Sequence, residues 1–176
     1  MEIKGATLLY TLTGLMITFV GFSALLLALR PAAGAKLSVL DKFPANTIMS
    51  HIFVLTAAAL MPPLFALFDT PDQWIWRSSS VLFAIPMLAL QVTFPHRRRK
   101  LVGKWPPRPV FAVFVVFGAV VTLAMLCYVL AGLKNSAAVY ITSLTIDFFT
   151  VAFGFLNAQD VIMQQAMIGS DRPSQD

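Results

Sequence analysis

A single carboxylate, Asp147, stands in the middle of the last long apolar stretch of the chain. Counted from Ser136 at about 1.5 Å per residue, it lies about 16 Å along a helix, close to the centre of a bilayer. An ionised carboxylate there costs at least about 2.5 kcal/mol, so it must be protonated, paired with a cation, or in contact with water or a bound ion. Such a residue is typical of ion or proton transport, and a protonated Asp that joins two helices is the structural alternative.

Small and polar residues recur at steps of three and four around Asp147, and this spacing places them on one face of a helix. The positions between them are almost all apolar. The pattern predicts a helix with one polar stripe, on which Ser143, Thr150 and Asn157 join Asp147 as candidate ion- or proton-binding residues. The complete stripe is Ser136, Tyr140, Ser143, Asp147, Thr150, Gly154 and Asn157.

Two more titratable residues lie about one turn inside predicted apolar segments, and they enter from opposite sides. Arg77 is the best cationic partner for Asp147, because its long side chain can reach inward. A histidine can titrate near neutral pH, so Arg77, Asp147 and His51 together would form a proton or cation route. The alternatives are that Arg77 extends to lipid phosphates and that His51 stays at the interface.

The sequence contains no motif for catalysis or for a cofactor: HExxH, GxSxG, the P-loop and GxGxxG are all absent. His51, His96, Cys127 and Asp147 do not have the spacing of metal ligands. Cys127 is the only cysteine, so it cannot form an internal disulfide. We therefore expect no enzyme activity, no metal and no cofactor.

The elements that must position these residues are membrane-spanning helices. The chain has 176 residues, of which 58% are hydrophobic and 12% charged, whereas soluble domains carry roughly 25% charged residues. Its apolar blocks are about 20 residues long, which matches the hydrocarbon core of a bilayer. We expect an all-α polytopic membrane protein, a single domain with a polar cytoplasmic tail at 159–176. The five predicted spanning helices are residues 5–29, 47–68, 74–94, 110–133 and 136–158.

Small residues also repeat along the first predicted helix, and prolines interrupt the second and third. The small residues predict a close helix–helix contact, which we expect against the polar stripe of the fifth helix, with a hydroxyl-lined path as the alternative. Pro62-Pro63 and Pro86 predict kinks. These kinks are either simple packing features or, through freed carbonyls, ion-binding features. The small residues are Thr7, Thr11, Gly14, Thr18, Gly21 and Ala28.

Six Lys and Arg residues and no acidic residue lie between the third and fourth predicted helices. Similar runs occur in nucleic-acid-binding proteins, but between two spanning helices they indicate a cytoplasmic loop that contacts anionic lipid headgroups. With this loop inside, ten of the 13 Lys and Arg residues lie inside, which predicts an N-out/C-in orientation. The prolines and glycine of this stretch argue against one continuous helix. The six cations are Arg97, Arg98, Arg99, Lys100, Lys104 and Arg108.

Two classes of function fit these patterns. The first is a transporter or channel for a cation or proton that uses Asp147. The second is a non-enzymatic accessory or assembly subunit, whose small-residue faces and Asp147 bind the helices of a partner. Five helices barely enclose a pathway, so we also expect a homo-oligomer or a partner membrane subunit. The expected location is a cell membrane of the bacterial inner-membrane type, and no nucleic acid is expected as a partner.

Overall fold

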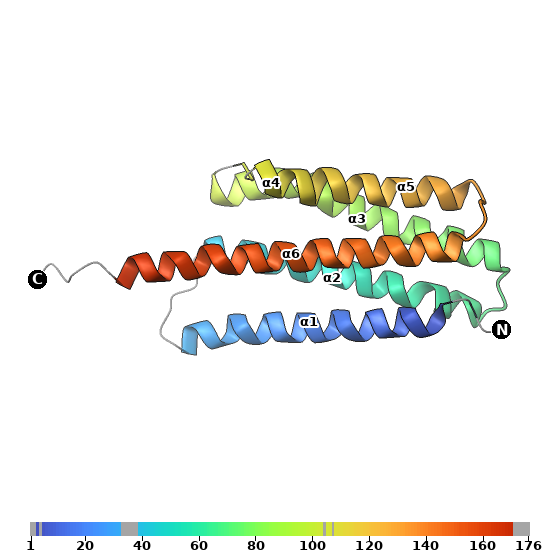
Figure 1. Cartoon of the computed structure of the whole chain (residues 1–176), viewed down its shortest axis with the longest axis horizontal. Helices are drawn as coiled ribbons and strands as arrows, with labels where there is room; N and C mark the ends of the chain where they lie inside the picture. Colours follow the sequence, from blue (N-terminus) through green and yellow to red (C-terminus); the bar gives the residue numbers. More distant parts are fainter. Residues whose placement is uncertain (1–2, 4, 33–38, 104, 107, 171–176) are drawn as a thin grey trace, which may run out of the picture.

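The computed structural model of the chain is a bundle of long helices (Figure 1). It describes residues 3, 5–32, 39–103, 105–106 and 108–170, without the side chains of residues 26–27, 30–32, 39–42, 44, 102, 108 and 157–170. The fourth predicted segment is built from α4, η1 and α5, which follow one another without a break. The helices are α1 (Ala6–Ala32), α2 (Val39–Ala66), α3 (Asp72–Val102), α4 (Arg108–Phe111), the π-helical η1 (Ala112–Phe117), α5 (Gly118–Leu130) and α6 (Ser136–Ser170).

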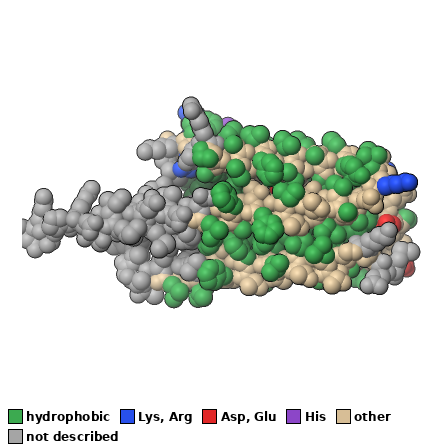
Figure 2. Space-filling model, in the orientation of Figure 1, with side chains coloured by type: hydrophobic (Ala, Val, Ile, Leu, Met, Phe, Trp, Pro, Cys, Tyr) green, Lys and Arg blue, Asp and Glu red, His purple; other side chains and the backbone are tan. Residues whose placement is uncertain are grey.

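The outer surface of the bundle is apolar along its length. Phe53, Leu67 and Phe68 are 76%, 78% and 74% exposed, and Figure 2 shows hydrophobic side chains along the sides and charged ones toward the ends. Large exposed apolar surfaces of this kind suit lipid and not water. The predicted all-α fold is confirmed, and the described residues contain five helices long and apolar enough to cross a membrane. They are Ala6–Leu25, Ala45–Ala66, Asp72–Leu101, Pro109–Leu130 and Ser136–Leu156.

Two helices extend well beyond their predicted ends. α3 continues through Pro95 and the basic residues to Val102, and Gly103, with φ of 74°, ends it in the left-handed conformation. The predicted end of this helix at residue 94 is therefore too early, because a proline removes one backbone hydrogen bond and leaves the others of the helix in place. The helix does end at Gly103, before α4 begins at Arg108, so residues 95–109 do not form one continuous helix, as predicted. α6 likewise continues to Ser170, through most of the stretch predicted as a polar tail.

α2 passes through Pro62-Pro63 and ends at Ala66. Pro62 has no N–H to donate to the carbonyl of Ala58, one turn earlier in the helix. The hydroxyl of Tyr140 in α6 donates to this carbonyl instead, over 2.9 Å. Because Tyr140 is fully buried, one bond satisfies both its phenol and the free carbonyl. The proline pair therefore does not break α2; it creates an acceptor for α6. α3 also continues through Pro86.

The small-residue face of α1 points out of the bundle, which corrects the predicted contact with α6. The residues of this face are all exposed: Thr7, Thr11, Gly14, Thr18 and Gly21. Gly14 and Gly21 have no neighbour within 4 Å of where a Cβ would lie. The hydroxyls of Thr11 and Thr18 donate to backbone carbonyls of their own helix, so they line no interior path.

Larger side chains of α1 occupy the bundle interior instead. Leu9 and Met16 are fully buried, and Phe19 packs edge-on against Phe148 and Phe155 of α6, at centroid distances of 5.8 and 5.2 Å. These bulky groups fill the space between the two helices, which small residues cannot do. The face of α1 that contacts α6 is therefore the opposite of the predicted one.

Candidate functional site

The polar stripe of α6 faces the interior of the bundle, as predicted. Tyr140, Ser143 and Asp147 are 0%, 6% and 1% exposed. Thr150 is half-buried and its hydroxyl donates to the carbonyl of Ile146 over 2.9 Å. The side chain of Asn157 lies outside the described residues. The stripe therefore carries Asp147 into the centre of the protein and not toward lipid.

Asp147 lies beside two polar side chains from other helices, Gln91 of α3 and Thr122 of α5. The Thr122 hydroxyl is 3.4 Å from Asp147 Oδ2. Gln91 Nε2 and Asp147 Oδ1 lie 2.6 and 3.8 Å from the position that a Cβ on Gly118 would take. Gln91 and Thr122 are 2% and 0% exposed. We call Gln91, Gly118, Thr122 and Asp147 the Asp147 cluster.

The Asp147 cluster contains more acceptor atoms than donors. Thr122 has one hydroxyl proton, and the carbonyl of Gly118, at 3.0 Å, is a nearer acceptor for it than Asp147 Oδ2. Asp147 Oδ1 and Gln91 Oε1 are both buried and have no hydrogen-bond partner. Unpaired buried oxygens are costly. A proton on Asp147, or a small cation bound beside it, would give Asp147 Oδ1 a partner.

Gly118 and the π-helical turn before it make this close arrangement possible. A Cβ at Gly118 would lie 2.6 Å from Gln91 Nε2, so glycine leaves room for the amide in its present position. η1 ends at this residue, and π-helical turns occur frequently at functional sites. One turn earlier, Phe114 of η1 is directed at α6, where its Cε2 would lie 2.1 Å from a Cβ at Gly154.

An aromatic layer separates the Asp147 cluster from the end of the bundle that carries the basic residues. Phe114 stacks with Phe94 at 5.8 Å and meets the ring of His51 edge-on at 5.7 Å. His51 is buried, and its Nδ1 lies 2.8 Å from the carbonyl of Thr47. Since a carbonyl only accepts, Nδ1 carries a proton and donates it. Its Nε2 is buried without a partner.

Arg77 and Asp147 do not meet. Gln91, which lies at the level of Asp147, follows Arg77 by fourteen residues of α3, a rise of about 21 Å. The guanidinium of Arg77 lies instead over the ring of Trp74, 5.7 Å from its centroid. The structure therefore does not form the predicted route from Arg77 through Asp147 to His51, although it places His51 close to the Asp147 cluster.

The predicted headgroup-binding cations lie near the end of α3. Arg98 donates to the carbonyl of Trp105, and Arg99 lies over the Trp105 ring at 5.4 Å. Lys100 is exposed and Arg97 half-buried. Lys104 and the side chain of Arg108 lie outside the described residues. Helix geometry thus gathers four cations in about one turn.

Sequence reasoning missed Gln91 and Thr122 as members of the site. Both carried a usable signal, since each is a polar side chain within an apolar segment. The sequence of one segment does not show which side chains Gln91 and Thr122 contact, or whether they point into the bundle. Among the described residues, no three His, Cys, Asp or Glu side chains lie close enough together to hold a metal ion.

The fold and the cluster define a class: an all-helical protein with five helices long enough to span a membrane, compatible with a multi-pass membrane protein, and with one buried carboxyl among amide and hydroxyl groups. No protein-family model, curated protein or solved structure matches the chain.

Proposed function

We propose that this protein moves protons or small cations across a membrane and that Asp147 is the group that binds them. The observation that carries the proposal is the pair of buried oxygens without partners, Asp147 Oδ1 and Gln91 Oε1. A proton on Asp147, or a small cation bound beside it, supplies the partner that Asp147 Oδ1 lacks. A purely structural carboxyl group would be expected to have a donor at each oxygen.

The surroundings of Asp147 also favour ion binding over helix association with a partner. Asp147 is 1% exposed, so it is not available to a neighbouring protein. Buried apolar residues separate the Asp147 cluster from one end of the bundle, with Met125 and Val129 following Thr122 along α5, and the Phe114 layer closes the other side. The arrangement corresponds to an occluded ion site, which a transporter opens to each side in turn.

The proposed setting is a bacterial inner membrane, with the amino terminus outside and the basic end of α3 in the cytoplasm. The distribution of Lys and Arg along the sequence supports this orientation. The basic end then meets anionic lipid headgroups through Arg97, Arg98, Arg99 and Lys100. We propose no enzyme activity.

The test is ion flux in vesicles that contain the purified protein. A pH-sensitive dye inside the vesicles reports proton entry, and replacing potassium by sodium separates proton from cation movement. Asp147→Asn should reduce flux by more than about tenfold, because Asn keeps the size of the side chain but does not take up a proton. Asp72→Asn, an exposed carboxylate of α3, is the matched control and should keep its flux. Wild-type flux no greater than that of empty vesicles would refute transport.

A second candidate, an accessory subunit of a membrane complex, is favoured by the outward small-residue face of α1. Gly14 and Gly21 leave open space that another helix can approach closely. Gly14→Leu together with Gly21→Leu should remove a bound partner while thermal stability stays the same. Cross-linking in native membranes measures this, and loss of the partner with undiminished flux in the Asp147→Asn variant would favour the accessory role.

A further inference from the structure

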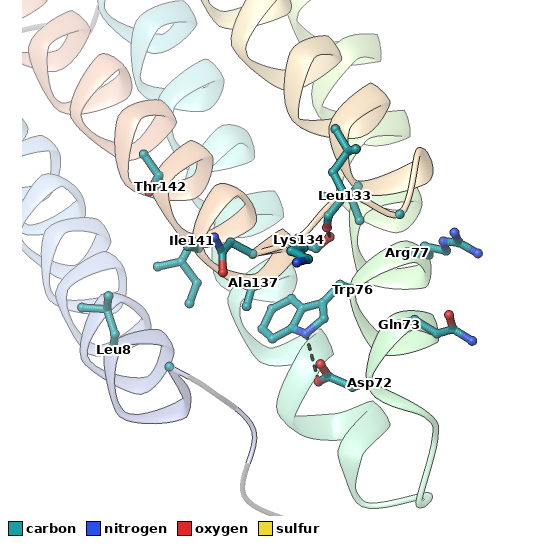
Figure 3. Close-up of a pocket in the computed structure, with 16 residues that line it drawn as sticks. Leu8, Asp72, Gln73, Trp76, Arg77, Leu133, Lys134, Ala137, Ile141 and Thr142 are labelled. Carbon is teal, nitrogen blue, oxygen red and sulfur yellow. Dashed lines mark hydrogen bonds between the residues drawn. The ribbon is translucent and has the colours of Figure 1, made fainter.

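A cavity of about 570 Å³ opens at the end of the bundle where α1, α3 and α6 begin. Figure 3 shows its residues coming from the first turns of α3 and α6, from the α5–α6 turn, and from α1. The volume is in the range of small-molecule sites. It lies apart from the Asp147 cluster, since Val129 in its wall follows Thr122 by seven residues of α5, about 10 Å.

The described lining of the cavity carries a net positive charge. Its described lining contains two cations, Arg77 and Lys134, and one carboxylate, Asp72. That carboxylate already accepts a hydrogen bond from Trp76 Nε1, over 3.1 Å (Figure 3). Three helices begin around the cavity, and the first turn of each helix presents free N–H groups and partial positive charge.

Arg77 packs against the turn that forms part of the cavity wall. Its Nε is buried and has no partner. Gly132 lies in the turn between α5 and α6 and has a φ of 68°. It lets the guanidinium approach closely, because a Cβ there would be 2.7 Å from Arg77 Nη2. Arg77 is thus held beside the cavity by packing, with its Nη2 next to Gly132, another residue of the wall.

The rest of the wall combines apolar and aromatic side chains with four neutral polar ones, which are Gln73, Asn135, Ser136 and Thr142. Leu8 of α1, Trp76 of α3, Val129 of α5 and Ile141 of α6 all line the cavity. An inorganic anion would leave this surface without a contact. A ligand with one anionic group and a compact apolar body would use both parts of the wall.

We propose that this cavity binds small amphipathic anions, with the carboxylate or phosphate group at Arg77 and Lys134 and the apolar body against the exposed side chain of Leu8, in the wall that also contains Trp76. The site stands independently of ion movement through Asp147. Either a water-soluble organic anion or the headgroup of an anionic lipid has the required chemistry.

The test uses the fluorescence of Trp76 in the full-length protein, in an uncharged detergent. Trp74→Phe and Trp105→Phe leave Trp76 as the only tryptophan among the three in the chain. The probe is 4-bromobenzoate, whose bromine quenches indole on contact, and neutral 4-bromobenzamide is its matched control. We expect saturable quenching by the carboxylate at a concentration about tenfold or more below that needed for the amide.

Charge removal identifies the groups that hold the anion. Arg77→Gln should raise the half-saturating concentration about tenfold, and Lys134→Gln, an exposed and screened cation, about threefold. Lys100→Gln, an exposed cation on the basic stretch of α3, should leave it unchanged. If the Arg77→Gln variant does not fold, the half-saturating concentration of the Lys134→Gln variant decides whether cations of the cavity hold the anion.

Equal quenching by carboxylate and amide would overturn the proposal, and so would an equal effect of Lys100→Gln and Lys134→Gln. Added phosphatidylglycerol competes if the occupant is a lipid headgroup and does not compete if it is a soluble anion; both results keep the anion site. Asp147→Asn should leave the quenching curve unchanged, so a failure of anion binding and a failure of ion flux are distinguishable.

Discussion

Two buried side chains of α6, Tyr140 and Asp147, differ in whether their oxygen atoms have hydrogen-bond partners. Tyr140 finds an acceptor, the carbonyl of Ala58, which Pro62 leaves free. Asp147, two turns further along, is equally buried and has an oxygen with no donor. The difference separates a side chain that joins two helices from one that keeps a buried acceptor without a donor.

The hydrogen bond between Tyr140 and Ala58 should contribute measurably to stability. Tyr140→Phe is expected to lower the free energy of unfolding by about 1 kcal/mol. In a Pro62→Ala background the loss should be smaller, because residue 62 then supplies an N–H to the same carbonyl. Unfolding in mixtures of dodecyl maltoside and dodecyl sulfate measures both, with the exposed Tyr10 changed to Phe as control. An identical loss of unfolding free energy in the two backgrounds would show that Pro62 does not affect the bond between Tyr140 and Ala58.

At the scale of the helices, glycines decide which faces come together. Gly118 admits Gln91, and Gly154 admits the ring of Phe114, whereas Gly14 on α1 meets nothing within 4 Å. Position along the sequence does not distinguish them, since all three lie within apolar segments. The neighbouring helix makes the difference.

Substitution of these glycines should therefore have opposite effects. Gly154→Ala places a Cβ 2.1 Å from Phe114 Cε2, and we expect a loss of about 1–3 kcal/mol from overpacking. Gly14→Ala should be neutral or stabilising by up to about 1 kcal/mol, because alanine favours helix. Thermal unfolding in detergent compares the two. Recovery of Gly154→Ala by Phe114→Leu would identify the ring as the cause, and equal losses at both glycines would contradict this account.

At the scale of the whole molecule, the two ends of the bundle differ in charge. The end where α3 begins carries both signs, with Asp72 beside Arg77 and Lys134. The four consecutive cations from Arg97 to Lys100 lie toward the other end. If the basic end is cytoplasmic, it meets anionic lipids, and the cavity beside Arg77 opens outward.

Labelling of single cysteines tests this orientation. In a Cys127→Ser background, Gln73→Cys should react with a membrane-impermeant maleimide on intact cells, because it lies outside. Lys100→Cys should react only after the cells are opened. Both positions are exposed in the structure, so access differs only through the membrane. The reverse pattern would contradict the N-out/C-in orientation.

The sequence by itself determined the helical class, the number of apolar helices, and the inward direction of the α6 stripe. Each follows from the residues of one segment: hydrophobic length sets the helix, and a polar stripe at helical spacing turns away from lipid. The sequence also pointed to Asp147, because a carboxylate in an apolar block stands out locally.

Only the tertiary structure decided the partners. It places Gln91 and Thr122 beside Asp147, leaves Arg77 about two-thirds of a bilayer core away, and turns the small residues of α1 outward. The physical reason is that lipid gives helices no hydrophobic preference among their apolar faces. Rotation and neighbours then depend on how side chains from distant segments fit together, which no single segment specifies.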